Sequence, residues 1–164
     1  MEFRVGLGYD SHRLILKEEN DSQPFVLAGI EIPHYKKCIA HSDGDVLLHS
    51  LCDALLGAAA LRDIGTHFPD TDPQYKNIDS QHLTRKVVEM VTGKGWTVNN
   101  IDITIIAEKP KMAPYILPMT QNLAQLLNIT PDRISIKAKT NEKLDAVGQE
   151  EAVVVHCIAS IIKT

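Results

Sequence analysis

The chain has 164 residues, of which 44% are hydrophobic and 23% are charged, and its net charge is −4. This length predicts one domain, residues 1–164, with a buried core, and the charge gives no indication of a general affinity for nucleic acid. An apolar stretch long enough to span a membrane is absent from the sequence, and the start lacks the apolar core of a signal peptide. Cys38, Cys52 and Cys157 have no C-x-x-C spacing, which predicts reduced, mostly buried thiols in a cytoplasmic protein.

Hydrophobic periodicity and turn residues predict strands and helices that interleave along the chain. In chain order we expect a strand over 3–9, a hairpin of two short strands over 25–33, a connection over 34–41, a helix over 42–61, a loop over 62–75, a helix from 79 or 80 to 93, a strand over 96–107, a helix from 113 or 114 to 127, and strands over 133–139 and 152–162. This order predicts an α/β or α+β fold in which helices cover one face of a sheet.

A cluster of possible metal ligands lies in the first strand and the first helix. Asp10 and His12 are two residues apart where the first strand is expected to end, so their side chains should face the same side. The expected helix begins at Ser42 or Asp43 as its N-cap. Asp45, His49 and Asp53 are spaced four apart on one face of this helix, opposite its apolar face. Asp10, His12 and His49 would form a three-ligand zinc site with one open position, with Asp45 or Asp53 orienting the His49 ring. The alternative is that these are structural residues without a ligand.

The stretch from 41 to 82 is acidic and rich in histidine, with seven of the Asp residues and four of the seven His. Asp63, Asp70 and Asp72 lie in its loop, where functional groups commonly occur. Three interpretations stay open for these carboxylates: ligands of a cation, caps of turns, or a solvated acidic face.

Other residues favour phosphate as the ligand. Ser42, preceded by His41, would lie at a helix N-terminus, where backbone amides bind phosphate. Lysines lie at the ends of two expected strands, in residues 107–112 and 137–143. They could neutralise phosphates or simply keep the surface soluble. Glu142 with Thr140 could hold Mg²⁺ on a diphosphate. The sequence has neither the Walker pattern nor a complete G-x-G-x-x-G nucleotide-binding pattern. The candidate metal and phosphate residues together predict a metal-assisted phosphoryl-transfer or phosphoester enzyme.

Four segments together resemble one enzyme family. They are D-S-H at residues 10–12, A-H-S-D-G-D-V-L-L-H-S-L-C-D-A-L-L-G-A-A-A-L-R-D-I-G-T-H-F-P-D-T-D-P at 40–73, I-A-E-K-P-K-M at 106–112 and K-A-K-T-N-E-K at 137–143. In this order they are similar to the 2-C-methyl-D-erythritol 2,4-cyclodiphosphate synthases, over essentially the whole chain. The resemblance implies a step of the non-mevalonate isoprenoid pathway: the 2-phosphate of 4-diphosphocytidyl-2-C-methyl-D-erythritol 2-phosphate attacks the β-phosphorus, which gives the cyclic diphosphate and CMP.

The resemblance also implies roles for individual residues. Asp10, His12 and His49 correspond to the ligands of Zn²⁺, and Glu142 to the ligand of Mg²⁺ or Mn²⁺, and all four are expected beside the substrate. His41 and Ser42 correspond to contacts of the erythritol phosphate, and His41, Lys139 and Thr140 are expected to act in catalysis. The remaining expected substrate contacts are Asp63, Gly65, Phe68, Pro69, Asp70, Thr71 and Asp72 near the erythritol part, and Ala107, Lys111, Met112, Ala113, Ala138, Lys139 and Thr140 near the cytidine.

The family resemblance further implies a homotrimer with active sites between subunits. The implied fold is an α/β sandwich of ferredoxin-like appearance, with a four-stranded mixed sheet facing the three-fold axis, and the apolar stretch 152–162 suits burial on both faces. Ala146 and Gln149 stand where many bacterial members have Phe and Arg lining an axial cavity that can hold an isoprenoid diphosphate. This departure resembles the plant-type variant. The expected compartment is the cytoplasm or, for a mature chain, the plastid stroma.

Two other functions are compatible with the residues. A zinc phosphodiesterase would use water as the nucleophile and release a linear product. A metal-stabilised trimer could instead serve as a binding module without catalysis, in which case loss of His49 would unfold the protein.

Overall fold

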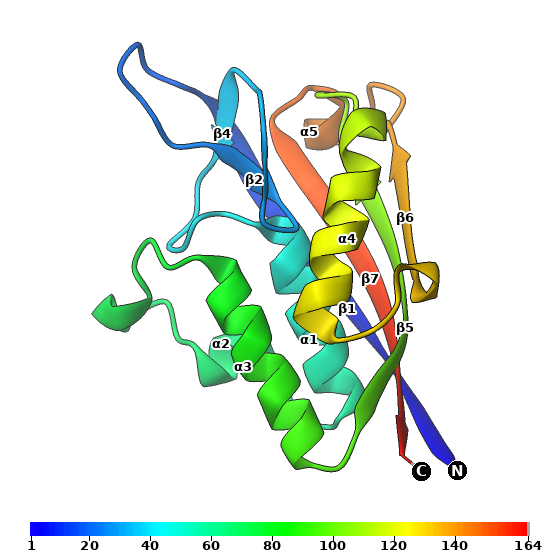
Figure 1. Ribbon diagram of the computed structural model, residues 1–164. Helices are drawn as coiled ribbons and strands as arrows, with labels where there is room; N and C mark the ends of the chain where they lie inside the picture. The colour runs from blue at the N-terminus through cyan, green and yellow to red at the C-terminus, as the bar shows by residue number, and fades with distance from the viewer. Residues whose placement is uncertain (164) are drawn as a thin grey trace.

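The computed structural model describes residues 1–163, which form a mixed sheet with helices packed on one face (Figure 1). The strands are β1 (Glu2–Leu16), β2 (Phe25–Leu27), β3 (Ile30–Ile32), β4 (Lys36–Cys38), β5 (Thr97–Ile106), β6 (Ile134–Lys139) and β7 (Ala152–Lys163). The α-helices are α1 (Val46–Ala58), α2 (Ile64–His67), α3 (Ser80–Gly93), α4 (Ile116–Leu127) and α5 (Asp145–Gly148), and 3-10 turns occupy Pro73–Tyr75, Ala113–Tyr115 and Pro131–Arg133. The α/β class predicted from the sequence is thereby confirmed.

Within the described chain the main sheet has five strands in the order β4-β1-β7-β5-β6, one more than the expected four. The additional strand is β4, which lies in the segment expected to be a plain connection and pairs Cys38 with Leu14. Its three residues, Lys-Lys-Cys, carry no alternating apolar pattern, so the sequence does not predict this strand. It forms by pairing with the end of β1. β5 and β6 are parallel and the other neighbours are antiparallel, while β2 and β3 form the predicted hairpin.

β1 is longer than predicted, since it continues past residue 9 to Leu16 in unbroken antiparallel pairing with β7. Asp10 and His12 therefore lie inside the strand and not at its end. Gly6 and Gly8 occupy the same strand face, and a Cβ built on them would lie 2.0 Å from the Ala54 carbonyl oxygen and 1.8 Å from the Ser50 carbonyl oxygen. The two glycines thus let α1 pack directly on the backbone of β1, on the face that carries Asp10 and His12.

α1 is buried on nearly all sides, because it lies between the sheet and α3. The helix begins four residues later than predicted, and its N-cap is Asp45, not Ser42 or Asp43: the Asp45 carboxylate accepts the N–H of Leu48 at 3.0 Å. The same carboxylate accepts the N–H groups of Ala28 and Gly29 from the β2–β3 turn at 3.0 and 2.7 Å. The start of the helix is therefore fixed by a tertiary contact as well as by local capping.

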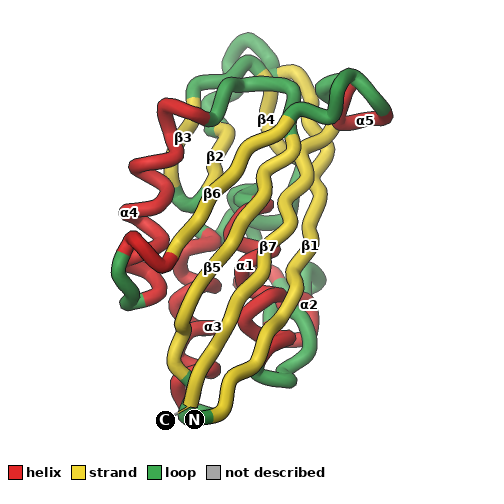
Figure 2. The backbone as a smooth tube through the Cα atoms, turned by 90° about the vertical axis from the view of Figure 1, so that its right-hand side faces the viewer, coloured by secondary structure: helices red, strands yellow, loops and turns green. Residues whose placement is uncertain are grey.

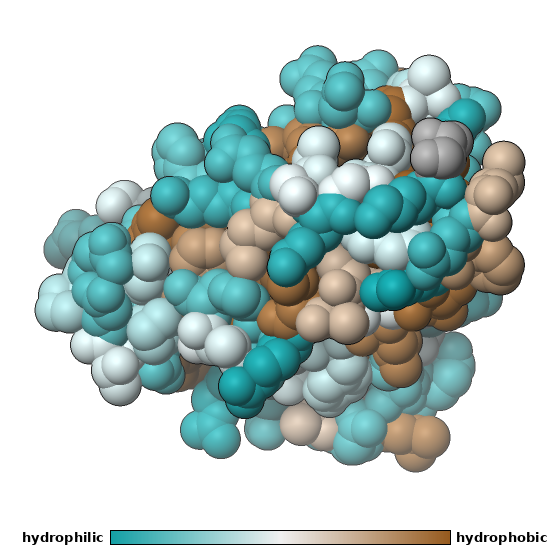
Figure 3. Space-filling model, turned by 90° about the horizontal axis from the view of Figure 1, so that it is seen from below, coloured by the Kyte–Doolittle hydropathy of each residue, from teal (hydrophilic) through white to brown (hydrophobic). Residues whose placement is uncertain are grey.

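The opposite face of the sheet carries no helix among the described residues (Figure 2). Exposed apolar side chains alternate along β1 at Phe3, Val5, Leu7 and Tyr9, and Ile158 of β7 adds to them. In the view from below, hydrophobic residues reach the surface on the side of the sheet (Figure 3). In β7 only one face is buried within the chain, so the expected burial on both faces is not met by one subunit.

The structure also bears on the expected thiols and membrane segments. Cys38, Cys52 and Cys157 are free and buried, as predicted. Every helix within residues 1–163 is too short or too polar to cross a membrane.

Candidate active site

A cavity of about 490 Å³ opens between β1, the segment before α1, and the loop after α1. Many of the residues predicted from the sequence come together in its lining: Asp10, His12, His41, Ser42, His49, Gly65, Phe68, Pro69 and Asp70. Asp53, Tyr75 and Ile78 also line it. The loop expected over 62–75 contains α2 and a 3-10 turn, which hold one wall of this cavity.

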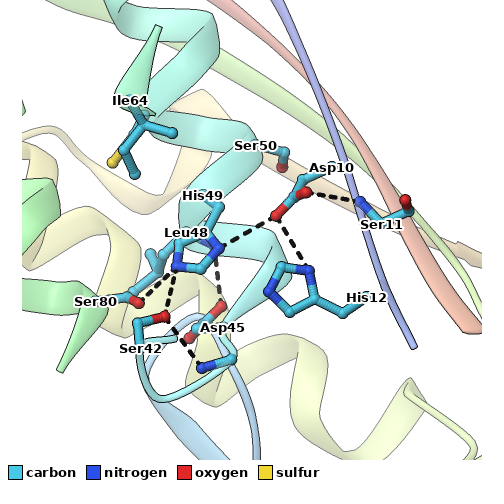
Figure 4. A network of polar contacts seen from close by, with 12 residues as sticks. Asp10, Ser11, His12, Ser42, Asp45, Leu48, His49, Ser50, Ile64 and Ser80 are labelled. Carbon is cyan, nitrogen blue, oxygen red and sulfur yellow. Dashed lines mark hydrogen bonds and ion pairs between the residues drawn. The ribbon is translucent and has the colours of Figure 1, made fainter. Parts of the chain in front are cut away.

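Asp10, His12 and His49 form a cluster that suits a metal ion (Figure 4). The Asp10 Oδ2 atom lies 3.3 Å from Nδ1 of His12 and 3.2 Å from Nδ1 of His49, and one ligand atom from each residue lies within 4.8 Å of the others. Donor atoms bound tetrahedrally to zinc at 2.0–2.1 Å are separated by about 3.3 Å, so the two shorter distances fit such a site. Among the described residues, the buried Nδ1 of His12 has no hydrogen-bond partner, which also fits a metal ligand.

The packing of α1 on β1 explains why these three residues meet. Gly8 lies against the Ser50 carbonyl, and Asp10 follows two residues later on the same face of the strand. His49 precedes Ser50 in the helix, so its ring lies over Asp10. The imidazoles of His12 and His49 have centroids 5.2 Å apart.

The balance between burial and nearby charge shifts the pKa values of the two imidazoles in opposite directions. Burial lowers the pKa of His12, although the nearby Asp10 carboxylate opposes this effect. For His49 burial is also the largest single influence and lowers the pKa, but the hydrogen bond to Asp10 and the charges of Asp10, Asp45 and Asp43 together raise it. His12 is therefore held as a neutral base, the form in which histidine binds a metal.

Neither Asp45 nor Asp53 orients the His49 ring, which corrects the prediction from helical spacing. Asp45 binds backbone N–H groups, and Asp53 Oδ1 accepts the N–H of Ile64 at 2.7 Å, which fixes the start of α2. The His49 Nε2 atom instead faces the hydroxyl oxygens of Ser42 at 3.1 Å and Ser80 at 2.9 Å. Ser80 was not identified from the sequence, because it lies 31 residues away in α3 and carries no recognisable spacing.

Other carboxylates of the acidic stretch cap turns. Asp63 Oδ1 accepts from the backbone N–H of Thr66 at 2.8 Å, and Asp72 Oδ1 accepts from that of Gln74 at 3.0 Å. Neither residue lines the cavity as the described residues define it, nor does the exposed Thr71. His41 does line it, and its buried Nε2 atom lacks a hydrogen-bond partner within residues 1–163.

A second group of the predicted residues gathers where β5 and β6 end. The N–H of Ala107 donates to the carbonyl of Lys139 at 3.0 Å, and Thr140 Oγ1 donates to Glu142 Oε1 at 2.7 Å. Glu108 Oε1 accepts the N–H groups of Asn141 and Lys143 at 2.9 and 3.1 Å and so shapes this loop.

The rest of this group flanks these residues in the sequence: Lys111, Met112, Ala113 and Ala138. Met112 is buried, whereas Lys111, Ala113 and Ala138 are exposed. The lining of the cavity, as residues 1–163 define it, includes none of the second group. Within one chain the predicted site is thus divided into two clusters.

Comparisons with known proteins agree with the residue-level similarity. Residues 3–162 match the YgbB family. The 2-C-methyl-D-erythritol 2,4-cyclodiphosphate synthase of Pseudomonas putida strain F1 is 53% identical over 159 residues, which are 97% of this chain and 98% of that protein.

Two solved structures show the same fold. The bifunctional IspDF of Campylobacter jejuni superimposes with a TM-score of 0.92 at 39% identity, over 99% of this chain and 43% of the larger protein. The Plasmodium falciparum IspF–CDP complex has a TM-score of 0.85 at 31% identity, over 99% and 97% of the two chains. On these grounds the chain belongs to the YgbB family, the family of the 2-C-methyl-D-erythritol 2,4-cyclodiphosphate synthases.

Proposed function

We propose that the cavity beside Asp10, His12 and His49 is where this cyclodiphosphate synthase closes its product ring. The enzyme converts 4-diphosphocytidyl-2-C-methyl-D-erythritol 2-phosphate to the 2,4-cyclodiphosphate and CMP in the non-mevalonate pathway, the activity of its family. An oxygen of the 2-phosphate forms a bond to the β-phosphorus. The bond from that phosphorus to the oxygen bridging to the α-phosphate breaks, and the bridging oxygen leaves with CMP.

The observation that carries this assignment is the three-residue cluster facing a cavity of about 490 Å³, a volume typical of small-molecule sites. Asp10, His12 and His49 would hold Zn²⁺, which, when bound, polarises and orients a phosphate as a Lewis acid. The carboxylate and two imidazoles are fixed by the packing of α1 on β1, so their positions are set before the substrate arrives.

The chain's own residues then orient the erythritol part. The Ser42 hydroxyl and the His41 imidazole face the cavity and would donate to the attacking phosphate. Gly65, Phe68, Pro69 and Asp70 form the opposite wall. Because the nucleophile is already an anionic phosphate oxygen, the reaction requires charge neutralisation and orientation, and we assign no general base.

We assign the second cluster to the nucleotide. Glu142, hydrogen-bonded to Thr140, would bind Mg²⁺ or Mn²⁺ together with the substrate phosphates, which suits a cation that takes few protein carboxylates. Lys139 and Thr140 would contact the diphosphate, and Ala107, Lys111, Met112, Ala113 and Ala138 would surround the cytidine. A CDP complex exists for a structural neighbour, which supports a cytidine nucleotide as the ligand.

The two clusters would be united in a homotrimer with sites between subunits. The exposed apolar side chains of Phe3, Val5, Leu7, Tyr9 and Ile158 supply a surface for association. The division of the predicted residues between the cavity and the ends of β5 and β6 supports sharing of each site between two chains. The bacterial relatives support the cytoplasm as the compartment.

Mixing two inactive variants tests this arrangement. Asp10→Ala removes the first cluster and Glu142→Ala the second, and each alone should abolish formation of the cyclic diphosphate, followed by ³¹P NMR. If a site is shared between neighbouring chains, subunit exchange after mixing restores about a quarter of the sites. Activity that stays absent after verified exchange would contradict shared sites, and full activity of either single variant would contradict the assigned roles.

A further inference from the structure

We propose that Ser80 and Asp43 are positioning residues that hold the His49 imidazole with its proton on Nε2. The Nδ1 atom then faces Asp10 and the cavity, where a metal ion would bind. This inference rests on the proposed role of His49 as a metal ligand and names two residues, outside that ligand set, that prepare the ring for it. A histidine that binds a metal through one nitrogen is typically fixed by a hydrogen bond from the other.

The direction of each hydrogen bond follows from Asp43. Its carboxylate can only accept, and it takes the Ser80 hydroxyl at 2.6 Å on Oδ1 and the Ser80 backbone N–H at 3.0 Å on Oδ2. The hydroxyl proton of Ser80 is therefore directed to Asp43. The Ser80 oxygen is left with lone pairs toward His49 Nε2, 2.9 Å away, so the ring nitrogen is the donor.

Burial makes this arrangement selective. Ser80 is completely buried, and His49 lies with its ring between Ser80 on one side and Asp10 on the other (Figure 4). The opposite tautomer would present a bare Nε2 to a hydroxyl whose proton is already donated to a carboxylate. It would also place a proton on Nδ1, where the metal would bind. Loss of the Nε2 proton would therefore leave two lone pairs facing each other beside a fully buried hydroxyl, which is unfavourable.

The two hydrogen bonds from His49 to Ser80 and from Ser80 to Asp43, here called the relay, also determine what Ser42 can do. Its oxygen lies 3.1 Å from His49 Nε2 and accepts the N–H of Gly44 at 3.3 Å. Because the ring proton points toward the two serine oxygens, the Ser42 hydroxyl does not have to donate to the ring. Its proton stays available for a phosphate in the cavity, which Ser42 lines and Ser80 does not, as the described residues define it. Ser80 and the half-buried Asp43 therefore set the direction of the hydrogen bonds of both the proposed metal ligand and the proposed phosphate donor.

Two measurements on the 164-residue chain test the relay. The first is the Zn²⁺ dissociation constant at fixed pH, obtained by competition with a chromophoric chelator. The second is the rate at which the His49 Nε2 proton exchanges with water, measured by NMR. We expect Ser80→Ala to weaken Zn²⁺ binding by about 10- to 100-fold. Ser80→Ala and Asp43→Asn should both speed the exchange of the Nε2 proton, because its hydrogen bond to Ser80 is lost or weakened.

Thr84→Val is the matched control. Thr84 is a buried hydroxyl one turn further along α3 whose Oγ1 donates to the Ser80 carbonyl at 2.9 Å, and it does not line the cavity. This variant should retain wild-type Zn²⁺ affinity and the wild-type exchange rate of the His49 Nε2 proton. If Ser80→Ala and Asp43→Asn both match Thr84→Val in affinity and exchange rate, the relay is wrong. If wild-type protein does not bind Zn²⁺, the proposed metal role fails, and the exchange measurement still decides whether Ser80 and Asp43 hold the ring.

Discussion

Gly8 of β1 lies directly beneath the Ser50 carbonyl of α1, so closely that a Cβ on the glycine would be 1.8 Å from the carbonyl oxygen. This contact brings together the strand that carries Asp10 and His12 and the helix that carries His49. The geometry of this three-residue cluster is therefore a consequence of how closely one helix can approach one strand.

Replacing Gly8 with alanine should separate these elements. Because the new Cβ meets backbone and not a movable side chain, α1 must shift, and we expect a loss of about 1–3 kcal/mol in the free energy of unfolding, with weaker Zn²⁺ binding. Urea denaturation and zinc titration measure the two effects. Gly57→Ala is the control: a Cβ at this exposed position of α1 meets nothing within 4 Å, so it should stabilise the helix by about 0.5–1 kcal/mol and leave zinc binding unchanged. Equal stability of Gly8→Ala and wild type would refute the close-packing argument.

Loss of His49 distinguishes an open catalytic site from a structural metal. We expect His49→Ala to remain folded, since α1 is held mainly by its buried leucines, while turnover falls by at least about a hundredfold. Circular dichroism and a product assay on the same preparation measure both properties. An unfolded His49→Ala variant would instead favour the metal-stabilised binding module.

The sequence predicted most of the elements and the clustering of Asp10, His12 and His49, but it could not predict contacts between distant segments. The leucine pattern of α1 and the spacing of Asp10 and His12 are local features, and both led to correct placements. β4 and the Asp45 cap depend on partners elsewhere in the chain, at Leu14 and in the β2–β3 turn. Ser80 reaches His49 only after α3 packs on α1, so no local pattern could reveal it.

The stability of the protein should decrease with pH because of Asp45. Burial raises the pKa of this carboxyl to about 7, and its hydrogen bonds to backbone N–H groups offset this only in part. Since the folded-state pKa lies above the unfolded value, the folded state binds the proton more tightly, and stability falls as pH rises from about 4 to 7 and then levels off. Asp45→Asn should lack this component. Identical slopes of unfolding free energy against pH for zinc-free wild type and Asp45→Asn would contradict the prediction.

The three cysteines should be unreactive in the folded protein. Burial raises the pKa of Cys38 and of Cys52 to about 12, and it also raises the pKa of Cys157. At pH 8 the thiolate population is therefore very small, and the sulfurs are shielded from reagents. A chromogenic disulfide reagent should label these thiols only after denaturation. Rapid labelling of the native protein would show that at least one thiol is accessible.

The measurement that tests the central claim most directly is a single-turnover reaction in H₂¹⁸O with Zn²⁺ and Mg²⁺. Mass spectrometry then determines the mass and isotope content of the phosphorylated product. Attack by the substrate's own 2-phosphate predicts a cyclic diphosphate without ¹⁸O, accompanied by unlabelled CMP. A linear product that carries one ¹⁸O atom would show that water is the nucleophile, and the enzyme would then be a phosphodiesterase.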